Sequence, residues 1–259
     1  MALTQTQVHE TIATLMMDDA ARRNAMSVAM AREMVAAFER FRAEGARAVV
    51  LRAPPRAKVW SSGAAVDELP SEGPEPFGGG EALSSVVKAI REFPAPVIAL
   101  IEGGVWGGAC EVALACDLRI AVAGATFAIT PAKLGLIYNI TGVLAVLRLV
   151  PAAVAKELLF TGQPIDAARA WVLGIVNHVK TPDEIDGFAY GVAAQIALNA
   201  PVSIAAMKEE IRLLDDARVI PPDLSARMLE LRRQVYGTSD YQEGLCAFRE
   251  KRAPQFRGE

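Results

Sequence analysis

Residues 102–117 read EGGVWGGACEVALACD and mark a passage from a buried strand into a helix. The apolar run Val97–Ile101 predicts the strand, and a helix is expected to start near Gly108 and to run to about Cys116. Glycine lets the backbone turn sharply here and approach a ligand closely. The first N–H groups of a helix have no helical partners, and the helix dipole favours negative charge beside them. The junction is therefore suited to hold an anion, although glycines before a helix more often serve packing.

Another glycine-marked junction, Ser61–Ala65, lies earlier in the chain; it is called the first junction, and the one within residues 102–117 the second. The first junction follows a short strand expected at Val59–Ser62 and contains Gly63. Two N–H groups that converge on one point form an oxyanion hole, commonly worth a few kcal/mol per donor. Taken alone, glycines at these junctions are a weak signal for such a site.

Outward from the junctions, the first half of the chain alternates strands with helices, and the second half is mostly helical. The expected strands are Val8–Met17, Ala48–Leu51, Val59–Ser62, Val97–Ile101, Leu118–Ala123, Ala125–Ile129 and Ile175–Val179. The helices expected in the first half are Ser27–Ala43, Glu81–Phe93 and Gly108–Cys116. The stretches expected to lack regular structure are the loop Pro70–Gly80 and the break Gly103–Gly108. The later helices are expected at Gly142–Leu149, Val154–Phe160, Ile165–Leu173, Asp183–Leu198, Pro201–Asp215, Leu224–Tyr236 and Tyr241–Arg252. This pattern predicts one α/β domain with a helical tail.

Composition limits the classes of partner. The chain has 259 residues, of which 52% are apolar, and a formal net charge of −3, which favours neither nucleic acid nor an anionic membrane. Its three cysteines show no metal-like spacing and indicate free thiols in a reducing compartment. The first residues lack the features of a secretory signal, and polar residues interrupt the longest uncharged stretch, Gly187–Met207. We expect a cytoplasmic protein without nucleic-acid or membrane partners.

Several common enzyme classes lack their motifs in this chain. Its two histidines, His9 and His178, fall in expected strands and are a poor supply of general bases. There is no GxSxG nucleophile motif, no HxxxH or paired CxxC metal motif and no GxxxxGKS/T nucleotide loop. No metal site is therefore expected.

Three motifs carry a family resemblance: Asn24-Ala25 after the first strand, Ser62–Ala64 after the third, and Gly107–Glu111 at the start of a helix that reaches Asp117. Their order and spacing resemble the crotonase (enoyl-CoA hydratase/isomerase) superfamily over essentially the whole chain. The resemblance implies CoA-thioester substrates and an oxyanion hole formed by the N–H groups of Ala64 and Gly108.

The same resemblance implies the architecture and the assembly. The expected fold is α/β, a crotonase-type spiral of ββα turns with a C-terminal helical trimerisation region. Residues 1–200 would form the spiral core, and residues 201–259 would pack on that core and on neighbouring subunits. The expected assembly is a homotrimer or a homohexamer.

Four stretches resemble one branch of the family more closely, the branch that decarboxylates methylmalonyl-CoA. They are Lys58–Ser61, Gly104–Ala109, Thr130–Asn139, and Asp240–Gly244 leading to Phe248–Arg252. The implied reaction gives propionyl-CoA and CO2 through a thioester enolate that the oxyanion hole stabilises. CoA would be part of the substrate, and neither a metal nor biotin would be needed as a cofactor.

Two carboxylates are what the hydratases of this family use to position and activate water. Glu111 stands at the position of the first, but the second would fall on Pro131, which has no proton to exchange. Hydration is therefore disfavoured. Tyr138 and Thr130 are candidates to hydrogen-bond the substrate carboxylate, and the alternative for Tyr138 is that it only packs.

One departure from the decarboxylating branch lies at the first junction. That branch carries histidine and aspartate where this chain has Ala64 and Ala65. A backbone N–H survives the change, but the imidazole is absent. Three possibilities stay open: the decarboxylase, another acyl-CoA enzyme of the family (an isomerase, hydratase or thioester hydrolase), or a catalytically inactive CoA-binding subunit.

The phosphates of CoA call for cations at the mouth of the pocket. By the family pattern, Arg22, Arg23 and Lys58 would serve, and Ala65 would lie against the CoA. Phe248 and Lys251 on the last helix would reach the CoA of a neighbouring subunit. For each cation the alternative is an ordinary solvated surface residue.

Overall fold

The computed structural model describes residues 2–69, 77–217 and 221–258. Within them, the larger sheet contains, in hydrogen-bonded order, β1 (Thr4–His9), β2 (Ile12–Met17), β3 (Ala48–Arg52), β5 (Val97–Ile101), β7 (Leu118–Val122) and β10 (His178–Lys180). The smaller sheet contains β4 (Val59–Ser61), β6 (Gly104–Trp106), β8 (Thr126–Ala128) and β9 (Ile165–Asp166) in that order. The pairs β1–β2 and β8–β9 are antiparallel and the others are parallel.

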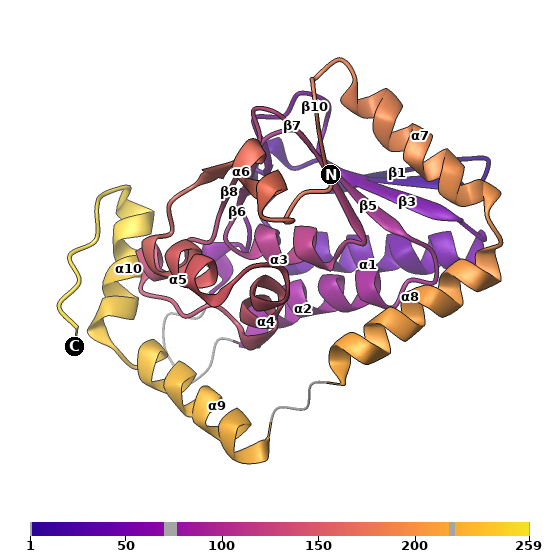
Figure 1. The fold of residues 1–259 in the computed structure, drawn as a ribbon. Helices are drawn as coiled ribbons and strands as arrows, with labels where there is room; N and C mark the ends of the chain where they lie inside the picture. Colours follow the sequence, from indigo (N-terminus) through magenta and orange to yellow (C-terminus); the bar gives the residue numbers. More distant parts are fainter. Residues whose placement is uncertain (1, 70–76, 218–220, 259) are drawn as a thin grey trace.

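The described helices surround these sheets (Figure 1). The α-helices are α1 (Val28–Ala43), α2 (Phe77–Arg91), α3 (Gly108–Ala115), α4 (Ile140–Leu149), α5 (Ala152–Thr161), α6 (Ala167–Val172), α7 (Ile185–Leu198), α8 (Pro201–Asp216), α9 (Pro222–Tyr236) and α10 (Ser239–Glu250). The short 3₁₀ helices are η1 (Ala20–Arg22), η2 (Val66–Glu68) and η3 (Pro131–Leu134).

A repeated unit builds the spiral. Each of the pairs β3–β4, β5–β6 and β7–β8 places its first strand in the larger sheet and its second in the smaller one. The first two pairs are each followed by a helix, α2 and α3. The structure thus confirms the α/β fold of ββα turns, followed by C-terminal helices.

The core lies between layers. α7 covers one face of the larger sheet, and α1, α2 and α3 lie on the other side (Figure 1). Every residue of β3 and β5 is buried, which explains why both strands are continuous apolar runs apart from Arg52. Each fully buried Val, Leu or Ile contributes about 1.5–3 kcal/mol. This layered core carries the β4 and β6 junctions at a fixed place.

Two expected elements near the N-terminal half differ from the structure. The run Val8–Met17, expected as one strand, turns at Glu10, whose φ of 53° allows a two-residue hairpin between β1 and β2. The expected break Gly103–Gly108 contains β6, which pairs with β4 and β8. A Cβ atom added at Gly103 would lie 2.5 Å from the Ala57 carbonyl oxygen, so the glycine is there because two backbone segments approach closely.

Other boundaries also shift. Residues 77–80 form the start of α2 instead of a loop, while 70–76 of that expected loop lie outside the described residues. The expected helix Ile165–Leu173 begins with β9 instead, because Asp166 caps α6 by accepting from Arg169 N–H. The expected strand Ile175–Val179 is displaced to β10, since the N–H groups of Ile175 and Val176 donate to Ala170 O in the turn after α6.

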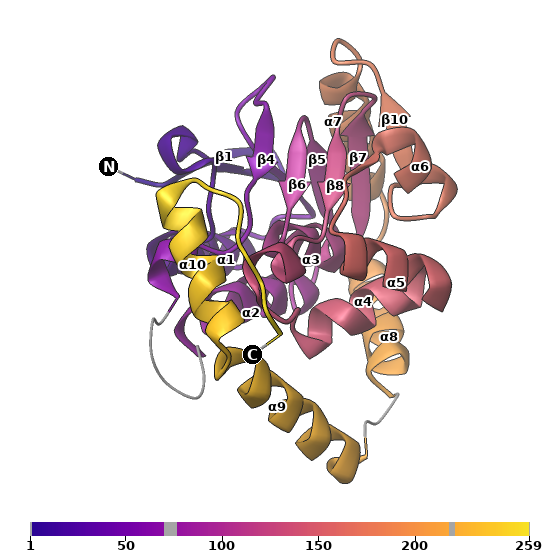
Figure 2. The same cartoon turned by 90° about the vertical axis from the view of Figure 1, so that its left-hand side faces the viewer.

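The C-terminal helices differ in how they contact the core. Figure 2 shows α9 extending away from the two sheets, while α10 returns beside them. Tyr236, Tyr241 and Leu245 form a small apolar cluster on which Leu136 and Ile137 pack. The division at residue 200 and the packing on neighbouring subunits stay predictions.

Among the described residues, no single helix is long and apolar enough to cross a bilayer. The bent pair α7 and α8, at 106° to each other, reaches that length and apolarity only when taken together.

Candidate active site

The two glycine-marked junctions meet in the structure. A Cβ atom added at Gly63, after β4, would lie 2.7 Å from Gly108 N and 2.5 Å from Trp106 O. A Cβ atom added at Gly108, the first residue of α3, would lie 3.3 Å from Ala64 N. The N–H groups of Ala64 and Gly108, predicted as a pair of donors, therefore belong to adjacent backbone segments.

Hydrogen bonds fix the loop that carries Ala64. Met26 N–H donates to Gly63 O at 2.7 Å, and Ala65 N–H donates to Met26 O at 3.2 Å. Gly63 N–H donates to Ser61 Oγ at 3.2 Å. No acceptor from the described part of the chain bonds the N–H of Ala64, which lies between these two bonded amides.

Asn24, which belongs to one of the family motifs, holds the end of β4 just before the loop that carries Ala64. Its side-chain amide donates to Trp60 O at 3.0 Å, and its carbonyl oxygen accepts from Ser61 Oγ at 2.6 Å. The residue is buried and has a φ of 52°, a conformation that asparagine tolerates better than most residues. Asn24 thus joins the turn before α1 to the end of β4, which carries the first donor.

The second donor lies at the start of α3. Gly107 caps the helix with a φ of 56°, and its N–H donates to Ala128 O at 2.8 Å. The N–H of Gly108 finds no acceptor within the described ranges, as expected for the first turn of a helix. The helix dipole adds partial positive charge at this point. The two unpaired amides therefore offer a place for an oxyanion.

Tyr138 packs against this helix start. Its ring is buried over Gly142, where an added Cβ atom would lie 2.6 Å from a ring carbon. Its hydroxyl donates to Gly107 O at 3.4 Å. Burial raises the pKa of Tyr138 well above its ordinary value, so the phenol keeps its proton and can donate a hydrogen bond. The predicted Tyr138 therefore lies directly beside the second junction.

Thr130 approaches the same point from the end of β8. Its Oγ1 atom lies 3.2 Å from where a Cβ atom on Gly107 would stand. Thr130 also occupies the position before η3 without capping it through its side chain. The hydroxyls of Thr130 and Tyr138 are thus both close to Gly107, and their contact with a substrate carboxylate stays a prediction.

Glu111 lies one turn into α3, and its carboxyl group is buried. Its two oxygens are hydrogen-bonded to Asn139 Nδ2 and to Thr141 Oγ1, each at 2.6 Å. Burial raises the pKa of Glu111, while the bonds from Thr141 and Asn139 and the charge of Arg232 oppose that rise. Glu111 is therefore a clamped, buried carboxyl group beside the oxyanion hole.

Asn139 and Thr141 are site residues that were not predicted from the sequence. Asn139 caps α4 by accepting from Gly142 N–H at 2.6 Å, and it reaches Glu111 with its other side-chain atom. The sequence does contain a signal for the cap itself, because asparagine two residues before a threonine and just ahead of an apolar run is typical of a helix start. What the sequence could not show is that this cap faces α3.

The predicted CoA-binding cations lie in different settings. Arg22 is held by Asp67, with contacts of 2.6 and 2.7 Å that lower the pKa of that carboxyl group. Arg23 ends η1, and its carbonyl oxygen accepts from Ser62 N–H at 3.0 Å, which places it beside the first junction. Lys58 is exposed just before β4.

The remaining predicted contacts with CoA are mixed in exposure. Ala65 is buried and directly follows the first donor, Ala64. Phe248 is 51% exposed, and Lys251 ends α10 in a left-handed conformation with its side chain exposed. The roles of these residues in binding CoA stay predictions.

Cys110 and Cys116 are buried, whereas Cys246 is exposed. Burial raises the pKa of Cys110 and of Cys116 to about 12, so both remain protonated thiols. No group of three or more His, Cys, Asp or Glu in the described ranges is arranged to hold a metal ion.

Two adjacent unpaired amides, one in the loop after β4 and one at the start of α3, define on this spiral of ββα turns an enzyme site that stabilises an oxyanion. The chain belongs to the enoyl-CoA hydratase/isomerase family, whose model matches residues 7–259. It is 40% identical over 235 residues to methylmalonyl-CoA decarboxylase of Escherichia coli (strain K12), covering 91% of this chain and 90% of that relative.

Solved structures and a second relative agree with this placement. The structure of methylmalonyl-CoA decarboxylase in complex with 2-nitronate-propionyl-CoA is similar with a TM-score of 0.96 and 37% identity, over 99% of both chains. Enoyl-CoA hydratase domain-containing protein 2 of Bos taurus is 33% identical over 96% of this chain and 85% of its own length. The predicted resemblance to the decarboxylating branch is confirmed.

Proposed function

We propose that this chain is a carboxy-lyase that converts methylmalonyl-CoA to propionyl-CoA and CO2. The observation that carries the proposal is the pair of adjacent, unpaired N–H groups of Ala64 and Gly108. The similarity to methylmalonyl-CoA decarboxylase over nearly the whole chain supports the choice of reaction within the family.

The chemistry follows from these two donors. The thioester carbonyl oxygen accepts from Ala64 N–H and Gly108 N–H, so negative charge that develops on it is stabilised. When the bond to CO2 lies perpendicular to the thioester plane, its electron pair flows into the carbonyl group and CO2 departs. Loss of one donor of this kind typically costs 10²–10³-fold in kcat, or about 2.7–4 kcal/mol. The remaining barrier is lowered by holding the carboxylate in that perpendicular orientation.

Tyr138 and Thr130 are suited to that orientation. Both lie against Gly107, beside the second donor, and the Tyr138 phenol is protonated. A hydrogen bond to a charged group is typically worth about 1.5–3 kcal/mol. These hydroxyls therefore hold the substrate carboxylate out of the thioester plane.

Hydration is less compatible with the site. Both oxygens of Glu111 are engaged by Asn139 and Thr141, and Pro131 stands where a second carboxylate is needed. A single clamped carboxyl group does not position and activate water by the two-carboxylate mechanism.

We extend the proposal to cofactor, assembly and location. CoA is part of the substrate, and no metal or biotin takes part. The chain acts as a homotrimer or homohexamer, which is supported by exposed apolar side chains on the C-terminal helices. These include Leu213, Leu214, Leu224, Leu229 and Leu231. Three free cysteines and the net charge of −3 support a cytoplasmic protein without nucleic-acid or membrane partners.

One assay separates the candidate functions. The protein is incubated with methylmalonyl-CoA while CO2, propionyl-CoA and free CoA are followed. We expect CO2 and propionyl-CoA in equal amounts. Free CoA with methylmalonate would indicate a thioester hydrolase, and binding without turnover would indicate an inactive CoA-binding subunit.

A further inference from the structure

A cavity of about 470 Å³ lies beside Glu111, among α2, α3, α4 and α8. Its walls include Glu111 and the later residues of α3, whereas Ala64 and Gly108 are not part of its lining. Thr141 and Ala145 of α4 line it as well. Glu111 therefore stands between the oxyanion hole at the start of α3 and a second space farther along the same helix.

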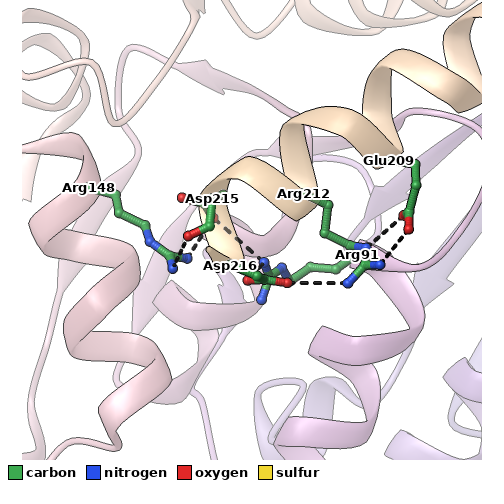
Figure 3. A network of polar contacts seen from close by, with 6 residues as sticks. All are labelled: Arg91, Arg148, Glu209, Arg212, Asp215 and Asp216. Atoms are coloured by element: carbon green, nitrogen blue, oxygen red, sulfur yellow. Dashed lines mark hydrogen bonds and ion pairs between the residues drawn. The ribbon is translucent and has the colours of Figure 1, made fainter. Parts of the chain in front are cut away.

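Ion pairs join α8 to α2 and α4 (Figure 3), and their members Arg91, Arg148 and Asp215 line this cavity. Arg148 of α4 contacts Asp215 of α8 at 2.6 Å, and Arg91 of α2 contacts Asp216 of α8 at 2.6 Å. Their side chains are 21–37% exposed, whereas Glu111 is 2% exposed. The space has both apolar and charged walls and is large enough for several waters, and the exposure of its lining falls from the ion pairs towards Glu111.

If Glu111 were a carboxylate, one of the short oxygen–oxygen contacts around Thr141 would have no proton between its two atoms. Thr141 Oγ1 lies 2.6 Å from Glu111 Oε1 and 2.8 Å from Asn139 Oδ1. The latter atom accepts from Gly142 N–H, so it is the carbonyl oxygen of the amide and cannot donate. The Thr141 hydroxyl has a single proton for two acceptors.

A carboxylic acid at Glu111 completes the network. The acid proton then bridges to Thr141, and the Thr141 proton bridges to Asn139, so that every contact is a hydrogen bond. Burial, which raises the pKa of Glu111, acts in the same direction. The geometry thus favours a neutral acid, which is a group that can donate a proton.

The proposed reaction needs such a donor. Cleavage of the bond to CO2 leaves an electron pair on the enolate, and propionyl-CoA forms only when the α-carbon takes up a proton. Residues three apart on a helix lie about 5–6 Å from each other at Cβ. Side chains also lean towards the helix N-terminus, so Glu111 lies on the face of α3 that begins at Gly108, with its carboxyl group held by Asn139 and Thr141.

We propose that Glu111 donates this proton, and that the cavity beside it is the solvent inlet through which Glu111 is recharged. The inference rests on the proposed decarboxylation. In each turnover the O–H bond of Glu111 breaks, the enolate electron pair forms a C–H bond, and the carboxylate takes a proton from water in the cavity. One solvent proton is consumed for each CO2 released, so the step balances. The Arg148–Asp215 pair marks the outer end of the inlet.

Glu111→Gln is a sharp test, because glutamine reproduces the neutral network without a transferable proton. Its amide nitrogen donates to Thr141, and its oxygen accepts from Asn139. Methylmalonyl-CoA is turned over in D2O, with incubations kept short against exchange of the substrate α-proton. The parent should give one configuration of α-deuterated propionyl-CoA. Glu111→Gln should lose about 100-fold in kcat, within the usual range for general acid catalysis, and should give both configurations.

The inlet is tested by filling it. Ala145→Phe places a ring in the cavity, and we expect kcat to fall about 5-fold or more, with KM unchanged and a single product configuration. Leu147→Phe, on the same helix but outside the cavity lining, is the matched control and should behave as the parent. Thermal melts of all variants show that each is folded.

The outcomes are distinguishable. A parent that releases no CO2 overturns the proposed function and this inference with it. CO2 release by the parent, with Glu111→Gln keeping both its rate and a single configuration, overturns the role of Glu111 alone. Equal rates for Ala145→Phe and Leu147→Phe overturn the inlet.

Discussion

The two junctions that form the oxyanion hole are built from similar sequence but are constrained in different ways. Gly63, in the first, has a φ of 87° and faces backbone atoms of Trp106 and Gly108 at 2.5 and 2.7 Å from an added Cβ. Gly108, in the second, has Leu83 Cδ2 at 3.0 Å and Ala64 N at 3.3 Å. The backbone atoms beside Gly63 cannot move away from an added methyl group, whereas the Leu83 side chain beside Gly108 can. The first glycine is therefore required by the fold, and the second by the chemistry.

Gly63→Ala should have the largest effect, on stability. A left-handed conformation costs an L-residue about 1–2 kcal/mol, and the backbone clash adds to it, so we expect a loss of about 3–5 kcal/mol. Gly45→Ala is the matched control, because Gly45 has a φ of 72° and no atoms within 4 Å of an added Cβ. Denaturant unfolding of both variants measures the difference. Equal losses would show that the clash at Gly63 relaxes.

Gly108→Ala should spare the fold and remove activity. Alanine is favoured over glycine in a helix, and the Leu83 side chain can move aside. The new methyl group, however, would stand 3.3 Å from Ala64 N, where the oxyanion must lie. We expect kcat to fall about 100-fold, comparable to losing one oxyanion donor, with unfolding free energy within about 1 kcal/mol of the parent. Full activity would place the oxyanion elsewhere.

Tyr138→Phe tests the polar group beside the second junction. It removes one hydroxyl and keeps the ring over Gly142. A positioning bond of about 1.5–3 kcal/mol corresponds to a 10- to 150-fold loss in kcat, since each 1.36 kcal/mol is tenfold. Affinity for CoA should hardly change. Turnover of methylmalonyl-CoA within about twofold of the parent would make Tyr138 a packing residue.

Ala64→His tests the first junction, which lacks the imidazole of the decarboxylating branch. The backbone donor is retained, so any gain comes from the side chain. If imidazole orients the substrate carboxylate, kcat at saturating methylmalonyl-CoA should rise several-fold, up to about tenfold for 1.36 kcal/mol. Unchanged or reduced turnover, together with native activity on another acyl-CoA, would contradict the substrate assignment.

Sequence alone predicted the elements whose signal is local. The buried strands β3 and β5 follow from continuous apolar runs, and α3 follows from the glycines at Gly107 and Gly108. β6 was not predicted, because its three residues are held by strands that are distant in the sequence. Its first residue, Gly104, also suggests that regular structure is interrupted there.

The surroundings of Glu111 were beyond sequence reasoning for the same reason. Asn139 and Thr141 are 28 and 30 residues away from Glu111, and they meet it only because α4 packs on α3. The ion pairs of Arg148 and Arg91 with α8 span 67 and 125 residues. No local sequence pattern encodes such contacts. The family motif therefore identified Glu111 as a site residue but gave no information on its hydrogen-bond partners or its protonation state.

The last expected effect is graded with pH and concerns stability at the second junction. Burial raises the pKa of Glu111 in the folded chain, against bonds from Asn139 and Thr141 and the charge of Arg232. Below the unfolded pKa of about 4.3, both states hold the proton, and Glu111→Gln should match the parent. Above it, the unfolded chain loses the proton while the folded chain keeps it, so the parent loses stability with rising pH until the folded pKa is passed.

Glutamine does not titrate, so the stability of Glu111→Gln relative to the parent should grow with pH, by at most about 1.36 kcal/mol per unit. Urea unfolding at pH 4, 5, 6 and 7 measures this, and the exposed Glu39→Gln controls for removing one charge. A difference that stays constant from pH 4 to pH 7 would mean that Glu111 is an ordinary carboxylate. The second junction would then bind the oxyanion without a proton donor of its own, and the enolate would take its proton directly from water.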